Sequence, residues 1–248
     1  MSNPFFQFFS TLPLQGPGST EDTLRVLNSI ISHLPTNPSI ADFGCGTGRS
    51  TLVLAKSLPD ATITAVDKAP PFIDVLREQV NQLGLGQRVW PVVGDMLTPS
   101  LEPGTLNLVW SEGAAYSVGL EAALRAWRPL LHGEARCVVS ECEWLSADRP
   151  AEVAAFWSEN YPAMGDRNEN VQRAEAAGYE VLCNHVLSDE GWNGYYGAIT
   201  SALARIPAGA LPAWFTDGMA REVQIREQAK GCFGYVFYVL RPRTSGES

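Results

Sequence analysis

Residues 40–48 combine one acidic residue with three glycines at alternate positions. The run Ile-Ala-Asp-Phe-Gly-Cys-Gly-Thr-Gly places Asp42 at the end of an apolar stretch, and residues with helical spacing follow from Arg49. A strand, a tight turn and a helix N-terminus produce this pattern. Glycine lets a ligand approach the main chain where a Cβ would block it, and the N–H groups of the helix start then face that ligand. The segment therefore predicts a turn that binds a small molecule.

The glycine spacing excludes two common nucleotide-binding turns. A dinucleotide fingerprint, G-x-G-x-x-G, would need its third glycine at position 49, which is Arg49. A P-loop that ends on Gly48 would need glycine in place of Phe43 and lysine in place of Arg49. The remaining pattern is D-x-G-x-G-x-G. A glycine-rich turn without a ligand is the alternative, although such turns rarely need three glycines so close together.

Three later segments continue this strand-and-loop arrangement. The apolar run 62–66 ends in Asp67, which lies 19 residues past Gly48. At this spacing in a βαβ unit an acidic residue reaches ribose hydroxyls, and a carboxylate can accept two hydrogen bonds from the diol. A third apolar run ends in Gly-Asp-Met at 94–96, and a fourth, 106–110, enters the polar loop 111–113.

Together, these four segments resemble the motifs of the class I S-adenosylmethionine (SAM) methyltransferases. The resemblance covers residues 19–145 and, by topology, the last two strands. It implies an α/β Rossmann-like fold: a seven-stranded, mostly parallel sheet with helices on both faces, an antiparallel last strand and a helical insertion before that strand. It also implies SAM as cofactor, methyl transfer as activity, and the following cofactor-binding residues: Asp42, Gly44, Cys45, Gly46, Thr47, Gly48, Asp67, Lys68, Gly94, Asp95, Met96 and Ser111.

The resemblance also implies what these residues do. The three glycines would let the methionine part of SAM lie on the backbone, and Asp42 would orient the turn or meet the amino group. Asp67 would bind the ribose, whereas Lys68, Asp95 and Met96 would surround the adenine. The methionine end would also meet the backbone of Ser111.

A narrower resemblance concerns the methyl acceptor. Residues 110–119, 139–144, 16–19 and 177–179 look like a bacterial subfamily of small-molecule methyltransferases related to the ubiquinone-biosynthesis group. Base-modifying amino methyltransferases read Asn-Pro-Pro-aromatic after the fourth strand, whereas residues 111–114 here read Ser-Glu-Gly-Ala. We therefore expect a small-molecule acceptor, not a nucleic-acid base.

Methyl transfer from SAM is an in-line displacement at carbon with sulfur as leaving group. The protein must hold acceptor, carbon and sulfur collinear and exclude water, and a base helps if the acceptor carries a proton. The catalytic candidates at the carboxyl ends of strands are Glu112, Tyr116 and Glu141. Each has a structural alternative: Glu112 could cap a turn, Tyr116 could pack, and Glu141 could form an ion pair.

The overall composition limits the kinds of molecule that the protein is expected to bind. The chain has 248 residues, 45% of them hydrophobic, and a net charge of −9, which disfavours a general nucleic-acid surface. Five scattered cysteines without a C-x-x-C pair indicate reduced thiols and a cytoplasmic protein, and three separated histidines give no metal motif. The N-terminal apolar block, with Phe5, Phe6, Phe8 and Phe9, is too short for a signal peptide or membrane span. It would pack on the core or form an aromatic lid.

We expect a single domain over 1–248: an N-terminal arm and helix (1–34), a cofactor-binding core (35–145), substrate-side helices with strand 6 and a cap insertion (146–230), and a last strand with tail (231–248). The expected strands are 39–43, 62–66, 88–93, 106–110, 135–141, 179–187 and 232–240. Hydrophobic periodicity predicts helices over 24–34, from 49, over 70–83, over 119–131, near 150–159 and 168–177, and one long helical segment over 189–230.

Two other functions stay open. One is a SAM-binding sensor or assembly protein without transfer activity, because binding and transfer share one turn. The other is an NAD-linked oxidoreductase on a related fold, against which Arg49 counts. The acceptor atom and the oligomeric state, including a homodimer, also stay open.

Overall fold

The structure is a computed structural model that describes residues 4–207, 209–229 and 231–243. Its seven strands are β1 (Ser39–Phe43), β2 (Thr62–Asp67), β3 (Val89–Val93), β4 (Leu106–Ser111), β5 (Leu131–Trp144), β6 (Tyr179–Val186) and β7 (Phe233–Pro242). They form one sheet in the order β3-β2-β1-β4-β5-β7-β6. The first five strands pair in parallel, and β7 lies antiparallel between β5 and β6. This arrangement confirms the predicted Rossmann-like fold.

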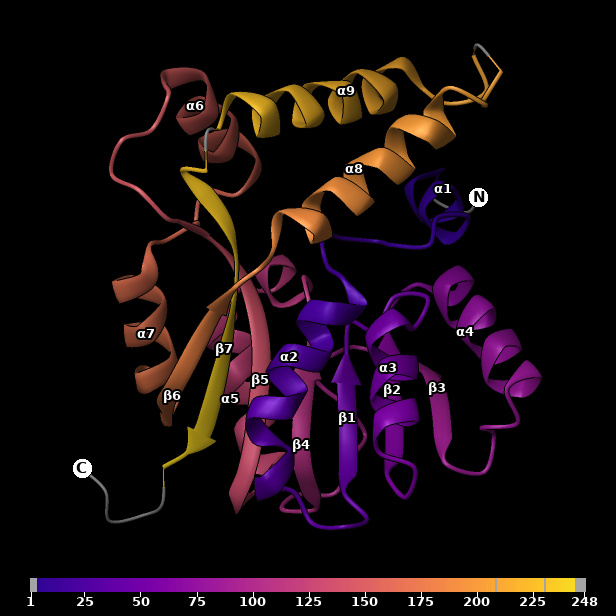
Figure 1. The fold of residues 1–248 in the computed structure, drawn as a ribbon, viewed down its shortest axis with the longest axis vertical. Helices are drawn as coiled ribbons and strands as arrows, with labels where there is room; N and C mark the ends of the chain where they lie inside the picture. The colour runs from indigo at the N-terminus through magenta and orange to yellow at the C-terminus, as the bar shows by residue number, and fades with distance from the viewer. Residues whose placement is uncertain (1–3, 208, 230, 244–248) are drawn as a thin grey trace.

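Helices cover both faces of the sheet (Figure 1). They are α1 (Pro4–Ser10), α2 (Thr20–Ile30), α3 (Arg49–Ser57), α4 (Pro70–Gln82), α5 (Leu120–Trp127), α6 (Ala151–Asn160), α7 (Arg167–Ala176), α8 (Asp189–Leu203) and α9 (Ala213–Gln228). Alternate residues of a strand point to opposite faces, so Ile40 packs with α2, α3 and α4, whereas Ala41 packs with α5 and α7. The central strands are buried on both faces, which explains their continuous apolar runs.

A cap of helices stands beyond the carboxyl ends of the parallel strands (Figure 1). It consists of α1, α6, α8 and α9. Aromatic rings join its parts: the ring centroids of Phe8 and Phe215 lie 5.2 Å apart, and those of Phe9 and Tyr195 lie 6.4 Å apart. The cap therefore connects the N-terminal arm to the insertion before the last strand.

The predicted bounds of two elements next to Pro129 were wrong. The helix expected over 119–131 ends at Trp127, because Pro129 allows only a turn of 3₁₀ helix before β5 begins at Leu131. The strand expected over 135–141 therefore runs over Leu131–Trp144.

The segment expected as one helical run over 189–230 is two helices. Residues 204–212 separate α8 from α9, and Pro207 and Pro212 lie in this connection. Proline lacks the N–H that continues a helix and restricts the residue before it, which explains the break. Residue 230 and the end of the predicted tail, 244–248, lie outside the described residues. Within the described part of the chain, no helix has the length and apolarity needed to span a membrane.

Candidate functional site

The turn after β1 has a left-handed backbone at all three glycines. The φ angles are 69° at Gly44, 57° at Gly46 and 94° at Gly48. The N–H of Gly44 donates to the carbonyl of Val66 at 2.8 Å, which holds the turn against β2. A Cβ would lie 2.2 Å from Ala114 Cβ at Gly44 and 2.1 Å from Leu76 Cδ1 at Gly48. The turn thus needs glycine for its conformation and for close packing on neighbouring segments.

Asp42 holds the start of α3 against β1. Its carboxylate is fully buried and accepts hydrogen bonds from Ser50 Oγ at 2.9 Å and Thr51 Oγ1 at 2.6 Å. Burial raises the pKa of Asp42 to about 7, against the opposing effect of these hydroxyls. Asp42 is absent from the pocket lining, so its position fits the first of its two predicted roles, orienting the turn.

Asp67, at the end of β2, lies beside the glycine turn. Its Oδ2 accepts a hydrogen bond from the Gly46 N–H and its Oδ1 accepts one from the Ala69 N–H, both at 2.9 Å. Burial raises the pKa of Asp67, and the two N–H donors oppose that shift. A carboxylate offers about four lone-pair sites, so each oxygen of Asp67 keeps acceptor capacity for a ligand.

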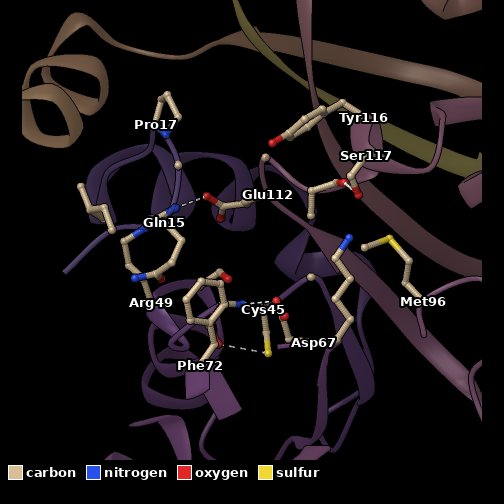
Figure 2. Close-up of a pocket in the computed structure, with 18 of the residues that line it drawn as sticks. Gln15, Pro17, Cys45, Arg49, Asp67, Phe72, Met96, Glu112, Tyr116 and Ser117 are labelled. Atoms are coloured by element: carbon tan, nitrogen blue, oxygen red, sulfur yellow. Dashed lines mark hydrogen bonds and ion pairs between the residues drawn. The ribbon is translucent and has the colours of Figure 1, made fainter. Parts of the chain in front are cut away.

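A cavity of about 320 Å³ opens between the turn, the N-terminal arm and the loop after β4. Its lining residues are Phe5, Phe6, Leu14, Gln15, Gly16, Pro17, Gly44, Cys45, Gly46, Arg49, Ser50, Asp67, Lys68, Phe72, Met96, Glu112, Gly113, Ala114, Tyr116 and Ser117. Figure 2 shows Asp67 and Cys45 facing this space from below, with Tyr116 and Glu112 above them. The cavity lies at the switch point of the sheet, where β1 and β4 are neighbours and ligands of open α/β sheets bind.

A narrow hollow adjoins the cavity at the end of β3. The N–H of Gly94 donates to the Asp67 carbonyl at 3.0 Å, and Asp95 Oδ1 accepts from the Leu97 N–H at 2.8 Å. Met96 and Lys68 line both the hollow and the cavity. The residues predicted to surround a purine ring are therefore brought together with Asp67.

The Glu112 carboxylate forms two hydrogen bonds and one ion pair with neighbouring side chains. Its Oε1 accepts from Thr23 Oγ1 and from Trp110 Nε1, both at 2.8 Å. Its Oε2 pairs with Arg49 Nη2 at 2.5 Å. Two neutral donors and the guanidinium thus hold the carboxylate in place, so this geometry favours a positioning role for Glu112.

Tyr116 lines the cavity, whereas Glu141 does not. Desolvation and then the charge of Glu222 raise the pKa of Tyr116 to about 12, so its phenol is protonated at neutral pH and can donate a hydrogen bond. Glu141 is fully buried and accepts from Tyr161 Oη and from the Cys142 N–H, both at 3.0 Å. Burial raises the pKa of Glu141 to about 7.

Like Asp42, the predicted cofactor residues Thr47, Gly48 and Ser111 line neither the cavity nor the adjoining hollow. Thr47 donates its N–H and its hydroxyl to Gln15 Oε1, at 3.0 Å and 2.8 Å. Gly48 packs on Leu76, and the buried hydroxyl of Ser111 has no hydrogen-bond partner among the described residues.

Sequence reasoning missed several residues at the site. Gln15 holds the arm over the turn, and Arg49 connects α3 to Glu112. Phe72 lines the cavity from α4, where its ring meets that of Phe6 at 5.5 Å. Arg49 could have been found from its place beside the third glycine, whereas no local signal marks Gln15. In the described ranges, no group of three or more His, Cys, Asp or Glu side chains could hold a metal ion.

Comparisons with known proteins place this geometry in context. Residues 40–133 match the family model for a methyltransferase domain. Over 81 residues the chain is 38% identical to a release factor glutamine methyltransferase of Moorella thermoacetica, covering 32% of this chain and 29% of that protein. Over 78 residues it is 31% identical to a demethylmenaquinone methyltransferase of Lactiplantibacillus plantarum, covering 31% and 33%. The chain thus matches only about a third or less of the length of these curated relatives.

A solved structure matches over the whole fold. It is a SAM-dependent methyltransferase from Geobacter sulfurreducens in complex with S-adenosylhomocysteine, with a TM-score of 0.80 and 17% identity, covering 98% of this chain and 99% of that one. At this identity the likeness shows the fold. Residues 40–133 are thus similar to a methyltransferase domain, and the chain has the Rossmann-like fold of that solved methyltransferase.

Proposed function

We propose that this protein is a SAM-dependent methyltransferase that acts on a small molecule. One observation carries the proposal: the Gly44–Gly46 turn and the Asp67 carboxylate line the same cavity at the switch point of the sheet. The methyltransferase-domain match over 40–133 covers both features. The narrower assignment to a subfamily related to ubiquinone biosynthesis is part of the same proposal.

The residues present fit the cofactor. Asp67 keeps lone pairs for the ribose diol, Asp95 lies at the adjoining hollow for an adenine amino group, and Met96 offers an apolar surface to the ring. The backbone of the turn would face the methionine part. Bound SAM supplies an activated methyl group with sulfur as leaving group.

The chain's own contribution is positioning and exclusion of water. The Arg49–Glu112 pair fixes the loop after β4 at the cavity wall. The rings of Phe5 and Phe6 cover the cavity from the arm. Tyr116, protonated at neutral pH, can donate a hydrogen bond to the acceptor. Holding the acceptor in line with the methyl group is the main requirement of this reaction, and no obligatory base is needed for it.

The cap supports a small-molecule acceptor. α1, α8 and α9 lie over the carboxyl edge of the sheet (Figure 1), and apolar side chains of the arm contribute to the cavity. The cavity of about 320 Å³ is the one that the cofactor would occupy, so the support for a small acceptor is the cap over its open side. The named relatives include both a protein-modifying and a small-molecule methyltransferase, so the choice rests on this enclosure.

Calorimetric titration with S-adenosylhomocysteine tests the cofactor. We expect micromolar binding, no comparable binding of NAD, and a loss of about tenfold or more in affinity for Asp67→Asn, because the amide replaces a charged acceptor by a weaker one. Asp60→Asn, at an exposed position, is the matched control. Tighter binding of NAD would overturn the proposal.

Methyl transfer itself needs a second measurement. Release of S-adenosylhomocysteine is followed while pools of small metabolites or of cellular proteins are supplied as acceptors. Turnover with metabolites is the expected result. Tight cofactor binding with turnover only on proteins would exclude a small-molecule acceptor, and binding without any turnover would favour a SAM-binding protein that transfers no methyl group.

A further inference from the structure

A second cavity of about 970 Å³ lies between α3 and α4, outside the site described above. Residues 10–13, at the end of the N-terminal arm, complete its walls. Thr47 lines this second space, whereas Gly44 and Gly46 line the first cavity, so the glycine turn lies between the two. We call the second space the helix groove. Its volume lies within the range of small-molecule binding sites.

One face of each helix contributes to the helix groove. The lining residues of α3 have the i, i+3, i+4, i+7 spacing of a single helix face: Arg49, Leu52, Val53 and Lys56. Those of α4 and its C-cap are spaced by four: Val75, Gln79 and Leu83. Leu52, Val53 and Val75 are only partly buried, and Leu83 is 60% exposed. Single exposed apolar residues are ordinary, but here apolar side chains face one groove from both helices.

The charged side chains of the helix groove are all cationic. Among the described residues, Arg49, Lys56 and Arg88 line it and no Asp or Glu does, although the chain has 27 acidic and 18 basic residues. The charge of Arg49 is balanced by Glu112. In residues 4–207, 209–229 and 231–243, no ion pair is recorded for Lys56 or Arg88. The groove therefore contains two cations without an acidic partner.

Backbone carbonyls fix Arg88 at one end of the groove. Its Nη2 donates to the Ala55 carbonyl at 2.7 Å, and its Nη1 donates to the Leu58 carbonyl at 3.4 Å. These acceptors hold the guanidinium in place but carry no net charge. Lys56 lies at the same C-terminal end of α3. A helix C-terminus contributes only about half a negative charge, so this end of the groove stays positive.

We propose that the helix groove is a second ligand site, and that its ligand is a small amphipathic anion. The apolar body would lie along the facing sides of α3 and α4, and the anionic group would meet Lys56 and Arg88. From Arg49 to Lys56 the helix rises about 10 Å, which a medium-length alkyl chain can span. The inference goes beyond the proposed function and does not depend on it.

Binding of two matched probes tests the proposal. The full chain is titrated calorimetrically with octanoate and with the neutral 1-octanol, in a buffer without detergent. We expect octanoate to bind about fivefold more tightly, because attraction to partly exposed cations contributes about that ratio. Equal binding of the two probes, or binding of neither, would overturn the proposal.

Two lysine variants locate the charge that selects octanoate. Lys56→Gln should reduce the preference for octanoate to about twofold or less and leave 1-octanol binding unchanged, because only the charge near the headgroup is lost. Lys68→Gln makes the same change at an exposed lysine of the first cavity and should keep the preference. The reverse pattern would place octanoate in the first cavity and overturn the proposal, whether or not that cavity binds S-adenosylhomocysteine.

A leucine variant tests the apolar wall. Leu83→Gln should weaken the binding of both probes, because it removes apolar surface from the groove without changing its charge. Leu182→Gln is the matched control, since Leu182 is 42% exposed on β6 and does not line the groove. Unchanged binding of both probes in Leu83→Gln would overturn the proposal. Dimers in sedimentation that Leu83→Gln alone dissociates would assign the groove to a second copy of the chain instead.

Discussion

The guanidinium of Arg49 lies 2.5 Å from the Glu112 carboxylate, so the first residue of α3 is fixed to the loop after β4. The same guanidinium donates to the Ser19 carbonyl and to Thr23 Oγ1, both at 2.9 Å. A Cβ on Gly18 would come within 2.4 Å of Arg49 Nη2, so the glycine leaves room for this side chain. One ion pair thus connects the glycine turn, the start of α2 and the cavity wall.

Glu112→Gln should lower the stability of the protein more than it changes the rate of methyl transfer. Arg49 and Glu112 are 19% and 4% exposed, and loss of the charge leaves a largely buried guanidinium underpaired. We expect the free energy of unfolding to fall by about 1–3 kcal/mol in a urea titration. Glu121→Gln, which breaks the exposed Arg125 pair on α5, should cost about 0.5 kcal/mol or less. An unchanged stability together with a loss of the acidic limb of the pH–rate profile, the fall in rate at low pH, would instead make Glu112 a base.

Glu141 should make the protein less stable as the pH rises. Its folded-state pKa of about 7 exceeds its ordinary value of 4.5, so the folded state binds the proton more tightly than the unfolded state. The stability contributed by the protonated carboxyl is fully present below pH 4.5 and is lost as the pH rises to about 7. In urea titrations across this window, Glu141→Gln should show a shallower decline than wild type. Some decline should remain, because burial also raises the pKa of Asp42 to about 7.

If the free energy of unfolding fell equally with pH in wild type and in Glu141→Gln, that result would contradict the raised pKa of Glu141. Glu152→Gln is the matched control, since this exposed residue of α6 undergoes the same substitution away from the sheet.

Gly48→Ala should destabilise the protein through α4. The residue has a φ of 94°, and the new Cβ would lie 2.1 Å from Leu76 Cδ1. Gly84 has a similar φ of 66°, and a Cβ there would meet no atom within 4 Å. Gly84→Ala should therefore lower the free energy of unfolding only by the backbone strain, about 1–2 kcal/mol. Overpacking should add about 1–3 kcal/mol at Gly48. Thermal unfolding measures the loss of stability in both variants. In a Leu76→Ala background, where the clash is relieved, Gly48→Ala should lower the stability less. An equal loss in both backgrounds would exclude the predicted clash.

Gln15→Ala should loosen the N-terminal arm. Gln15 accepts two hydrogen bonds from Thr47 and donates to the carbonyls of Phe9 and Leu12, both at 2.9 Å. Loss of these contacts should increase hydrogen exchange over 5–18 and weaken S-adenosylhomocysteine binding by about tenfold, equivalent to about 1.4 kcal/mol. Gln224→Ala, at an exposed position of α9, should change neither. Unchanged exchange would mean that ring packing alone holds the arm.

Local sequence patterns predicted the sheet and the binding turn well. The strands around Asp42 and Asp67 are apolar runs ended by acidic residues, and these signals are contained within a few residues. The ends of α5 and the split between α8 and α9 were missed, because periodic apolar residues continue across Pro129 and Pro207. Apolar periodicity reports which face is buried and is a poor guide to where a helix stops.

The residues that complete the site come from distant parts of the chain. Gln15 approaches Thr47 across 32 positions, and the ring of Phe6 meets that of Phe72 across 66. Neither side chain belongs to a motif with a fixed spacing. Their roles depend on how the cap packs on the sheet, which is decided by tertiary contacts between aromatic rings.

The position of α1 has a practical consequence for experiments. Phe5 and Phe6 line the cavity one or two residues after α1 begins at Pro4, whereas antiparallel β7 ends at Pro242, at the opposite edge of the sheet (Figure 1). An affinity tag fused ahead of α1 would therefore stand at the mouth of the binding site and compete with its ligands. Titrations and turnover assays should use protein purified through a C-terminal tag.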